Sequence, residues 1–126
     1  MLSCKKDNEA NPSIIGKWIL KAVKYENYYK GQLKETINSK NEDSSLFIEF
    51  RADGFGISNF FTGETAEGAY KLSDDGKYVI NLEDGVEVGR TEIKKLTSTE
   101  LQLYAEIDVR TEFEKDAYLF TFKKSN

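Results

Sequence analysis

Apolar and polar residues alternate along most of the chain, in short runs that are separated by turn residues. A period of two is typical of β-strands that bury one face. Trp18, Leu20 and Ala22 share one face of the first run, for example, and Leu101, Leu103 and Ala105 share one face of a later run. Eight runs follow one another, at residues 16–25, 45–51, 55–62, 68–72, 78–82, 86–96, 101–108 and 118–122. The pattern contains no long helical period and predicts an all-β domain.

Tight turns join these runs, as in antiparallel hairpins. Asp53-Gly54, Ser73-Asp74-Asp75-Gly76 and Glu83-Asp84-Gly85 are turn sequences, because glycine tolerates a positive φ and Asp favours turns. The alternation breaks near Gly89 and Arg90, where a β-bulge would restore its phase. We expect an eight-stranded antiparallel up-and-down barrel, since closure leaves no sheet edge exposed. We also expect a monomer.

Composition narrows the possible chemistry. The 126 residues suffice for one domain, and 18 basic against 22 acidic residues give a net charge of -4, so nucleic acid is not an expected partner. Histidine is absent and there is one cysteine, which removes the commonest general base, the commonest metal ligand and any intrachain disulfide. We therefore expect no enzyme activity, no metal and no cofactor.

The first residues resemble the end of a bacterial lipoprotein signal. Leu2-Ser3-Cys4 fits cleavage before a cysteine that is then acylated, and the charged run that starts at Lys5 resembles the tethers of surface lipoproteins in Bacteroidetes. This resemblance implies a tether over residues 1–12, a membrane anchor on Cys4, and a place in the cell envelope, on the outer membrane. The alternative is a frayed cytosolic N-terminus with a free thiol.

Gly16-Lys17-Trp18, at the start of the first of eight hairpin-linked strands, resembles the lipocalin superfamily, and in particular the short lipocalin-like lipoproteins of Bacteroidetes. The resemblance covers residues 13–126. It implies that Trp18 plugs the closed end of the barrel and that a basic side chain of the last strand, Lys123 or Lys124, packs across its ring. The chain departs from the family in lacking its Thr-Asp-Tyr element and room for a C-terminal helix.

The connection over residues 26–44 is longer than any other, and we expect it to be a loop. In lipocalins the matching loop lies over the open mouth, which would place Tyr28 and Tyr29 where an apolar ligand enters. The other interpretation is a mobile, solvated segment, because residues 38–45 are polar.

The inward face of the barrel provides the remaining candidate ligand contacts. A barrel of eight strands is either filled by side chains or holds one small ligand. The aromatic candidates are Phe50, Phe61, Tyr70, Tyr78, Tyr118 and Phe120, and the polar candidates are Asn59 and Arg90. For any single one of them, ordinary core packing is the competing interpretation.

Two functions follow from this pattern. The first is binding or sequestration of a small hydrophobic molecule, which requires an apolar cavity of about 300 Å³ or more. That cavity would open beneath Tyr28 and Tyr29. The second is a non-catalytic module that binds a protein or glycan through its rim and loops, with a filled core and exposed aromatic residues such as Phe47, Phe60 or Tyr104.

Overall fold

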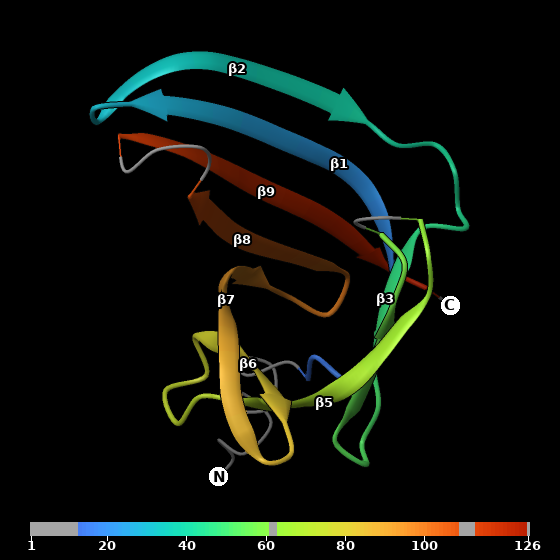
Figure 1. Ribbon diagram of the computed structural model, residues 1–126. Coiled ribbons are helices and arrows are strands. Elements are labelled where there is room, and N and C mark those ends of the chain that lie inside the picture. The colour runs from blue at the N-terminus through green and yellow to red at the C-terminus, as the bar shows by residue number, and fades with distance from the viewer. Residues whose placement is uncertain (1–12, 61–62, 109–112, 126) are drawn as a thin grey trace, which may run out of the picture.

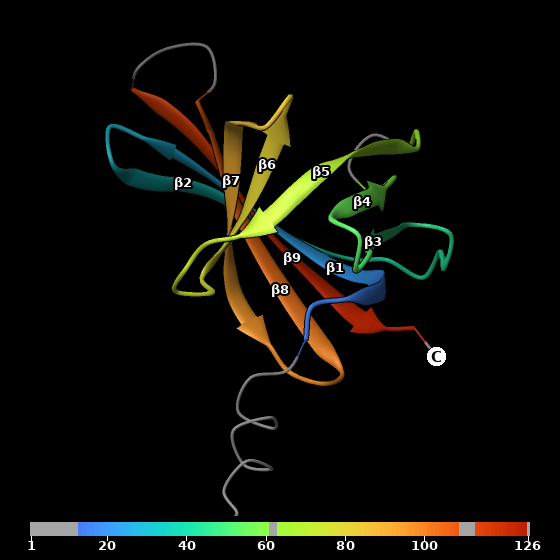
Figure 2. The ribbon, with the colours of Figure 1, turned by 90° about the horizontal axis from the view of Figure 1, so that it is seen from below.

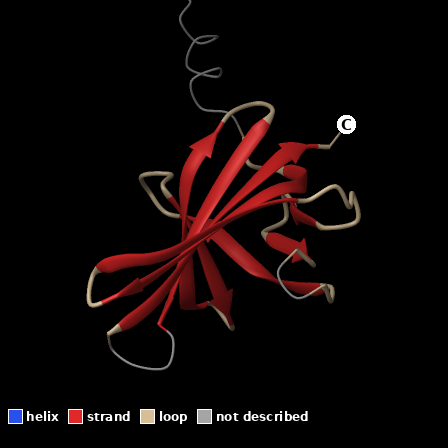
Figure 3. Ribbon diagram, turned by 90° about the horizontal axis from the view of Figure 1, so that it is seen from above, coloured by secondary structure: helices blue, strands red, loops and turns tan. Residues whose placement is uncertain are grey.

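Strands form most of the part of the chain that the computed structural model describes, which is residues 13–60, 63–108 and 113–125. Figure 3 shows strands and loops and no helix among these residues. The strands are β1 (Gly16–Tyr29), β2 (Gln32–Lys40), β3 (Phe47–Phe50), β4 (Phe55–Ser58), β5 (Ala66–Leu72), β6 (Tyr78–Glu83), β7 (Val86–Leu96), β8 (Glu100–Asp108) and β9 (Glu114–Lys124).

Eight of these strands close into an antiparallel barrel, which confirms the predicted fold. β3 to β9 pair with one another in chain order. β1 closes the ring, because its first residues, Gly16 to Ile19, pair with β3 while its other edge pairs with β9 along nearly its whole length. Figure 2 shows the strands of the closed barrel crossing one another.

The ninth strand, β2, corrects the prediction of a long loop over residues 26–44. β1 continues to Tyr29, and β2 returns antiparallel beside its second half, from Tyr29↔Gln32 to Ala22↔Lys40 (Figure 1). Lys30 and Gly31 form the turn between them with φ values of 52° and 79°. Two successive positive φ values give the two-residue turn whose twist matches a hairpin. The segment is therefore a β-ribbon outside the barrel ring.

Register shifts occur in four pairings of the described strands, β1–β2, β1–β9, β6–β7 and β7–β8. The pairing of β1 with β9 shifts between Leu20 and Ala22, and that of β7 with β6 passes from Glu87 to Gly89. Val88 is thus the extra residue in β7, next to the position where the sequence predicts a bulge. A bulge reverses which residues face inward beyond it.

The best-packed part of the core lies at one end of the barrel. Trp18, Leu101 and Phe122 are fully buried there, on β1, β8 and β9. Ile14, Leu20, Phe50, Val79, Leu103 and Phe120 complete the cluster. These side chains come from strands far apart in sequence, so the core depends on closure of the barrel.

Candidate ligand-binding cavity

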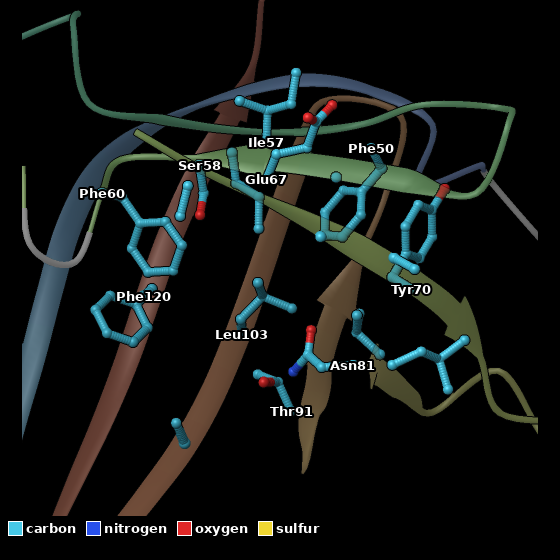
Figure 4. Close-up of a pocket in the computed structure, with 18 of the residues that line it drawn as sticks. Phe50, Ile57, Ser58, Phe60, Glu67, Tyr70, Asn81, Thr91, Leu103 and Phe120 are labelled. Carbon is cyan, nitrogen blue, oxygen red and sulfur yellow. The ribbon is translucent and has the colours of Figure 1, made fainter. Parts of the chain in front are cut away.

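A cavity of about 420 Å³ lies inside the barrel, between the wall formed by β3, β4 and β5 and the wall formed by β8 and β9 (Figure 4). Most of its lining is apolar. The lining residues are Ile48, Phe50, Gly56, Ile57, Ser58, Phe60, Ala66, Glu67, Gly68, Ala69, Tyr70, Val79, Asn81, Leu82, Thr91, Leu103, Ala105, Tyr118 and Phe120.

Small residues on β4 and β5 make this space. Gly56 is directly opposite Gly68, and Ser58 is opposite Ala66, so four adjacent positions in this wall carry little or no side chain. A Cβ atom built on Gly68 would meet no atom within 4 Å. The hollow therefore results from the sequence of these two strands, because interior space that large side chains do not fill stays open.

Aromatic rings form the ends of the cavity. The rings of Phe50 and Tyr70 meet edge to face with centroids 5.0 Å apart, and those of Phe60 and Phe120 meet at 4.9 Å. The Tyr118 ring stacks on Phe120 at 5.9 Å. Edge-to-face and offset contacts are the favourable geometries for such rings. Each ring is held by another, so these side chains form a pre-arranged apolar surface.

Hydrogen bonds fix two of the tyrosine rings. The Tyr70 hydroxyl donates to the Arg51 carbonyl oxygen at 2.8 Å, and burial raises the pKa of Tyr70. Tyr25 extends the aromatic wall beyond Tyr118, with ring centroids 5.3 Å apart. Its hydroxyl donates to Asp116 at 2.8 Å, and this hydrogen bond is the main cause that raises the pKa of Tyr25 to about 12. Both hydroxyls therefore stay protonated at neutral pH.

The structure brings four of the predicted ligand contacts together: Phe50, Tyr70, Tyr118 and Phe120 all line the cavity. Phe61 lies outside the described residues. Asn59 does not line the cavity. Its Oδ1 accepts from the Phe47 amide at 2.8 Å, and its Nδ2 donates to the Ser45 carbonyl at 2.7 Å. Asn59 thus joins the segments before β3 and after β4.

Tyr78 and Arg90 face outward, which corrects their predicted inward orientation. Arg90 forms two hydrogen bonds with Glu87, at 2.8 and 3.0 Å, and its guanidinium lies 5.2 Å from the centre of the Tyr78 ring. Val79 and Thr91 line the cavity instead. Apolar residues occupy both faces of β6, so alternation alone does not select the inner face. In β7 the extra residue is Val88, so Arg90 faces outward and Thr91 inward.

Tyr28 and Tyr29 do not line the cavity. The Tyr28 hydroxyl donates to Glu26 at 3.1 Å, and the Lys115 ammonium lies 5.2 Å from the Tyr28 ring centre. Tyr29 is 42% exposed at the end of the β1–β2 ribbon. Because this segment continues the strand, it carries both rings away from the barrel interior rather than over it.

Trp18 occupies the tightly packed end of the barrel. Its indole N–H donates to the Ile14 carbonyl at 2.8 Å, and the Lys124 ammonium lies 4.7 Å from its ring centre. Lys124, rather than Lys123, is therefore the basic residue across the ring. Lys124 also donates to the Ile15 carbonyl at 2.9 Å and passes over Gly16, where a Cβ atom would lie 2.7 Å from its Cε and Nζ.

Comparison with known families agrees with this arrangement. The sequence model of the lipocalin-like domain matches residues 14–103, which is more than half of the chain. The chain belongs to the lipocalin-like domain family. None of the curated proteins matches it. The crystal structure of a lipocalin-like protein from Bacteroides uniformis is similar to this lipocalin-like chain with 20% sequence identity, over 89% of this chain and 98% of that one, at a TM-score of 0.42.

The sequence analysis misses the four polar lining residues Ser58, Glu67, Asn81 and Thr91. Asn81 and Thr91 lie side by side on the wall opposite Ser58 (Figure 4). The signal that locates them is the pairing Val79↔Thr91 and Asn81↔Gly89, which requires the position of the β7 bulge. Within the described ranges, no group of three or more acidic, cysteine or histidine residues is placed to hold a metal ion. No helix of this part is long and apolar enough to cross a membrane.

Proposed function

We propose that this lipocalin-like barrel binds or sequesters a small hydrophobic molecule in the cavity between β3–β5 and β8–β9. The observation that carries the proposal is an interior space of about 420 Å³ with an apolar, aromatic lining. Ligand pockets usually measure roughly 300 to 1,000 Å³ and combine apolar walls with a few polar groups. A barrel that served only as a scaffold would gain stability by filling this space.

The packing of the aromatic residues also favours ligand binding over a rim-binding module. Phe60 packs inside, edge to face on Phe120 and Phe122. Phe47 and Tyr104 are half-buried, and each has a lysine ammonium over its ring, at 4.5 and 5.0 Å. Contacts with charged side chains make these rings poor anchors for a protein partner, whose hot spots are desolvated aromatic residues.

The experiment that tests the binding function fills the cavity. Gly68→Phe adds a ring where a Cβ atom meets nothing within 4 Å. We expect Gly68→Phe to weaken binding of the neutral fluorescent probe N-phenyl-1-naphthylamine by about tenfold or more, equivalent to ~1.4 kcal/mol. Probe fluorescence in a titration of purified protein measures the affinity.

Lys71→Phe is the matched control, because Lys71 is exposed on the same strand and lies opposite Ile80 outside the barrel. It should bind the probe as wild type does. The binding function is wrong if wild type does not bind the probe, or if Gly68→Phe binds it unchanged while a thermal melt shows both variants folded.

We further propose that Cys4 carries a lipid anchor that holds the barrel at the cell envelope, on the outer membrane. The support is the sequence Leu2-Ser3-Cys4 and the charged residues after it, which lie outside the described residues. When the full-length gene is expressed in its native cells with an alkyne-bearing fatty acid, wild type should be labelled and Cys4→Ser should not. Equal labelling of the two proteins, or recovery of both in the cytosol, would contradict this proposal.

A further inference from the structure

The polar groups of the cavity carry information about its ligand. Four polar side chains, of Ser58, Glu67, Asn81 and Thr91, are among its lining residues, together with Tyr70, whose hydroxyl is bonded to the Arg51 carbonyl. Glu67 forms an ion pair with Arg51 at 3.3 Å. Arg51 also pairs with Asp53, so two carboxylates share one guanidinium on this side of the cavity.

None of the described lining residues is basic. The sequence analysis places Arg90 inside, but its guanidinium is held outside the barrel by Glu87. An anionic head group at Asn81 and Thr91 would therefore have no basic lining residue beside it. The Glu67 carboxylate lines the same cavity and would repel a ligand carboxylate, so the cavity favours an uncharged ligand.

The side chains of Asn81 and Thr91 are available for a ligand, as is that of Ser58 on the opposite wall. Their amide and hydroxyl make no hydrogen bond with another residue of the described chain. Figure 4 shows the two side chains next to each other, directed into the space that Phe50, Phe60 and Phe120 enclose. An amide both donates and accepts, and so does a hydroxyl. Together they match one neutral polar group on a ligand.

We propose that the ligand is an uncharged, mainly apolar molecule whose single amide, carbonyl or hydroxyl group hydrogen-bonds to Asn81 and Thr91. This inference rests on the proposed binding function and specifies the ligand class. Its apolar body lies against the aromatic rings, and its polar group lies at the β6–β7 wall. The inferred orientation leaves no hydrogen-bonding group of the ligand buried without a partner, which would weaken binding.

Competition among three probes with similar chains tests the proposal. Decanamide, decanoate and decane are each titrated against bound N-phenyl-1-naphthylamine at pH 8, where the carboxylate is ionised. In wild type we expect decanamide to compete about tenfold more strongly than decanoate. Decanamide should also compete more strongly than decane, by roughly 10- to 100-fold, as expected for two neutral hydrogen bonds.

Variants then assign the polar contact. Asn81→Leu and Thr91→Val keep the side-chain volume and should each reduce the preference for decanamide over decane by roughly 3- to 10-fold. Thr121→Val makes the same change on the outside of β9, where Thr121 bonds to Gln102, and should leave the preference unchanged. Probe binding by each variant shows that its cavity is intact, and Thr91→Val provides the second test if Asn81→Leu does not fold.

The outcomes separate this inference from the binding function. If the probe binds and Gly68→Phe blocks it, but decanoate competes as well as decanamide, the ligand class is wrong and the binding function stands. If decanamide is preferred but neither Asn81→Leu nor Thr91→Val reduces that preference, the assignment to these residues is wrong. Failure of the probe to bind wild type removes both proposals.

Discussion

Replacing Trp18 with alanine is expected to lower the free energy of unfolding by about 3 to 5 kcal/mol, as deletion of a large buried aromatic side chain does. Trp18 is fully buried among Leu20, Leu101 and Phe122. Its removal leaves a void at the tightly packed end of the barrel and removes the indole donor to the Ile14 carbonyl. Urea denaturation followed by circular dichroism measures the loss.

Tyr29→Ala is the control for this prediction. It also deletes an aromatic ring from β1, but at a position that is 42% exposed. Its cost should be below about 1 kcal/mol, because surface substitutions away from special features have small effects. If Trp18→Ala cost no more than Tyr29→Ala, Trp18 would not be the structural plug of this barrel.

The strands of the barrel are predictable because local signals agree with the global fold. Asp84 and Gly85, for example, have φ values of 53° and 80°, and Asp-Gly is the sequence that such a turn favours. The β1–β2 ribbon is missed because its turn is Lys30-Gly31, in which lysine is an unusual residue for a positive φ. β2 also lacks an apolar alternation, because Leu33 and Ile37 are its only apolar residues, and all nine of its residues are exposed.

The cavity is only partly predictable, for a different reason. Phe50, Tyr118 and Phe120 lie on strands whose apolar face is clear in the sequence, and each of them lines the cavity. β6 is apolar on both faces, and on β7 one extra residue decides whether Arg90 or Thr91 faces inward, which the pairing Val79↔Thr91 settles. A shift of one residue changes the side-chain face, so the polar lining cannot be read from alternation alone.

The hollow itself is not visible as a pattern. It arises because Gly56 and Gly68 are opposite each other in adjacent strands. Sequence periodicity shows which residues face inward, but it does not show that two small inward residues meet across a strand pair. Register supplies that information, and here it is the antiparallel pairing of β4 with β5.

Gly16→Ala is expected to be the other strongly destabilising substitution, with a loss of about 1 to 3 kcal/mol from backbone strain alone. Gly16 has a φ of 132°, which side chains other than glycine rarely adopt. The added Cβ would also lie 2.7 Å from Cε and Nζ of Lys124. Lys124 would then have to leave both the Trp18 ring and the Ile15 carbonyl. Denaturant unfolding measures the sum of these effects.

A double-mutant cycle separates the two causes. In a Lys124→Ala background the crowding is absent, so Gly16→Ala should cost only the backbone strain, and the difference between the two backgrounds gives the coupling. Gly89→Ala is the control, because Gly89 lacks a positive φ and its Cβ would meet nothing within 4 Å. Gly89→Ala should cause no loss of unfolding free energy.

Two outcomes would contradict this prediction. Equal costs for Gly16→Ala in both backgrounds would show that Lys124 is not held against Gly16. A cost no larger than that of Gly89→Ala would show that β1 starts without strain. The expected coupling instead makes Gly16, Trp18 and Lys124 one structural unit, in which glycine is required so that the lysine can cross the indole ring.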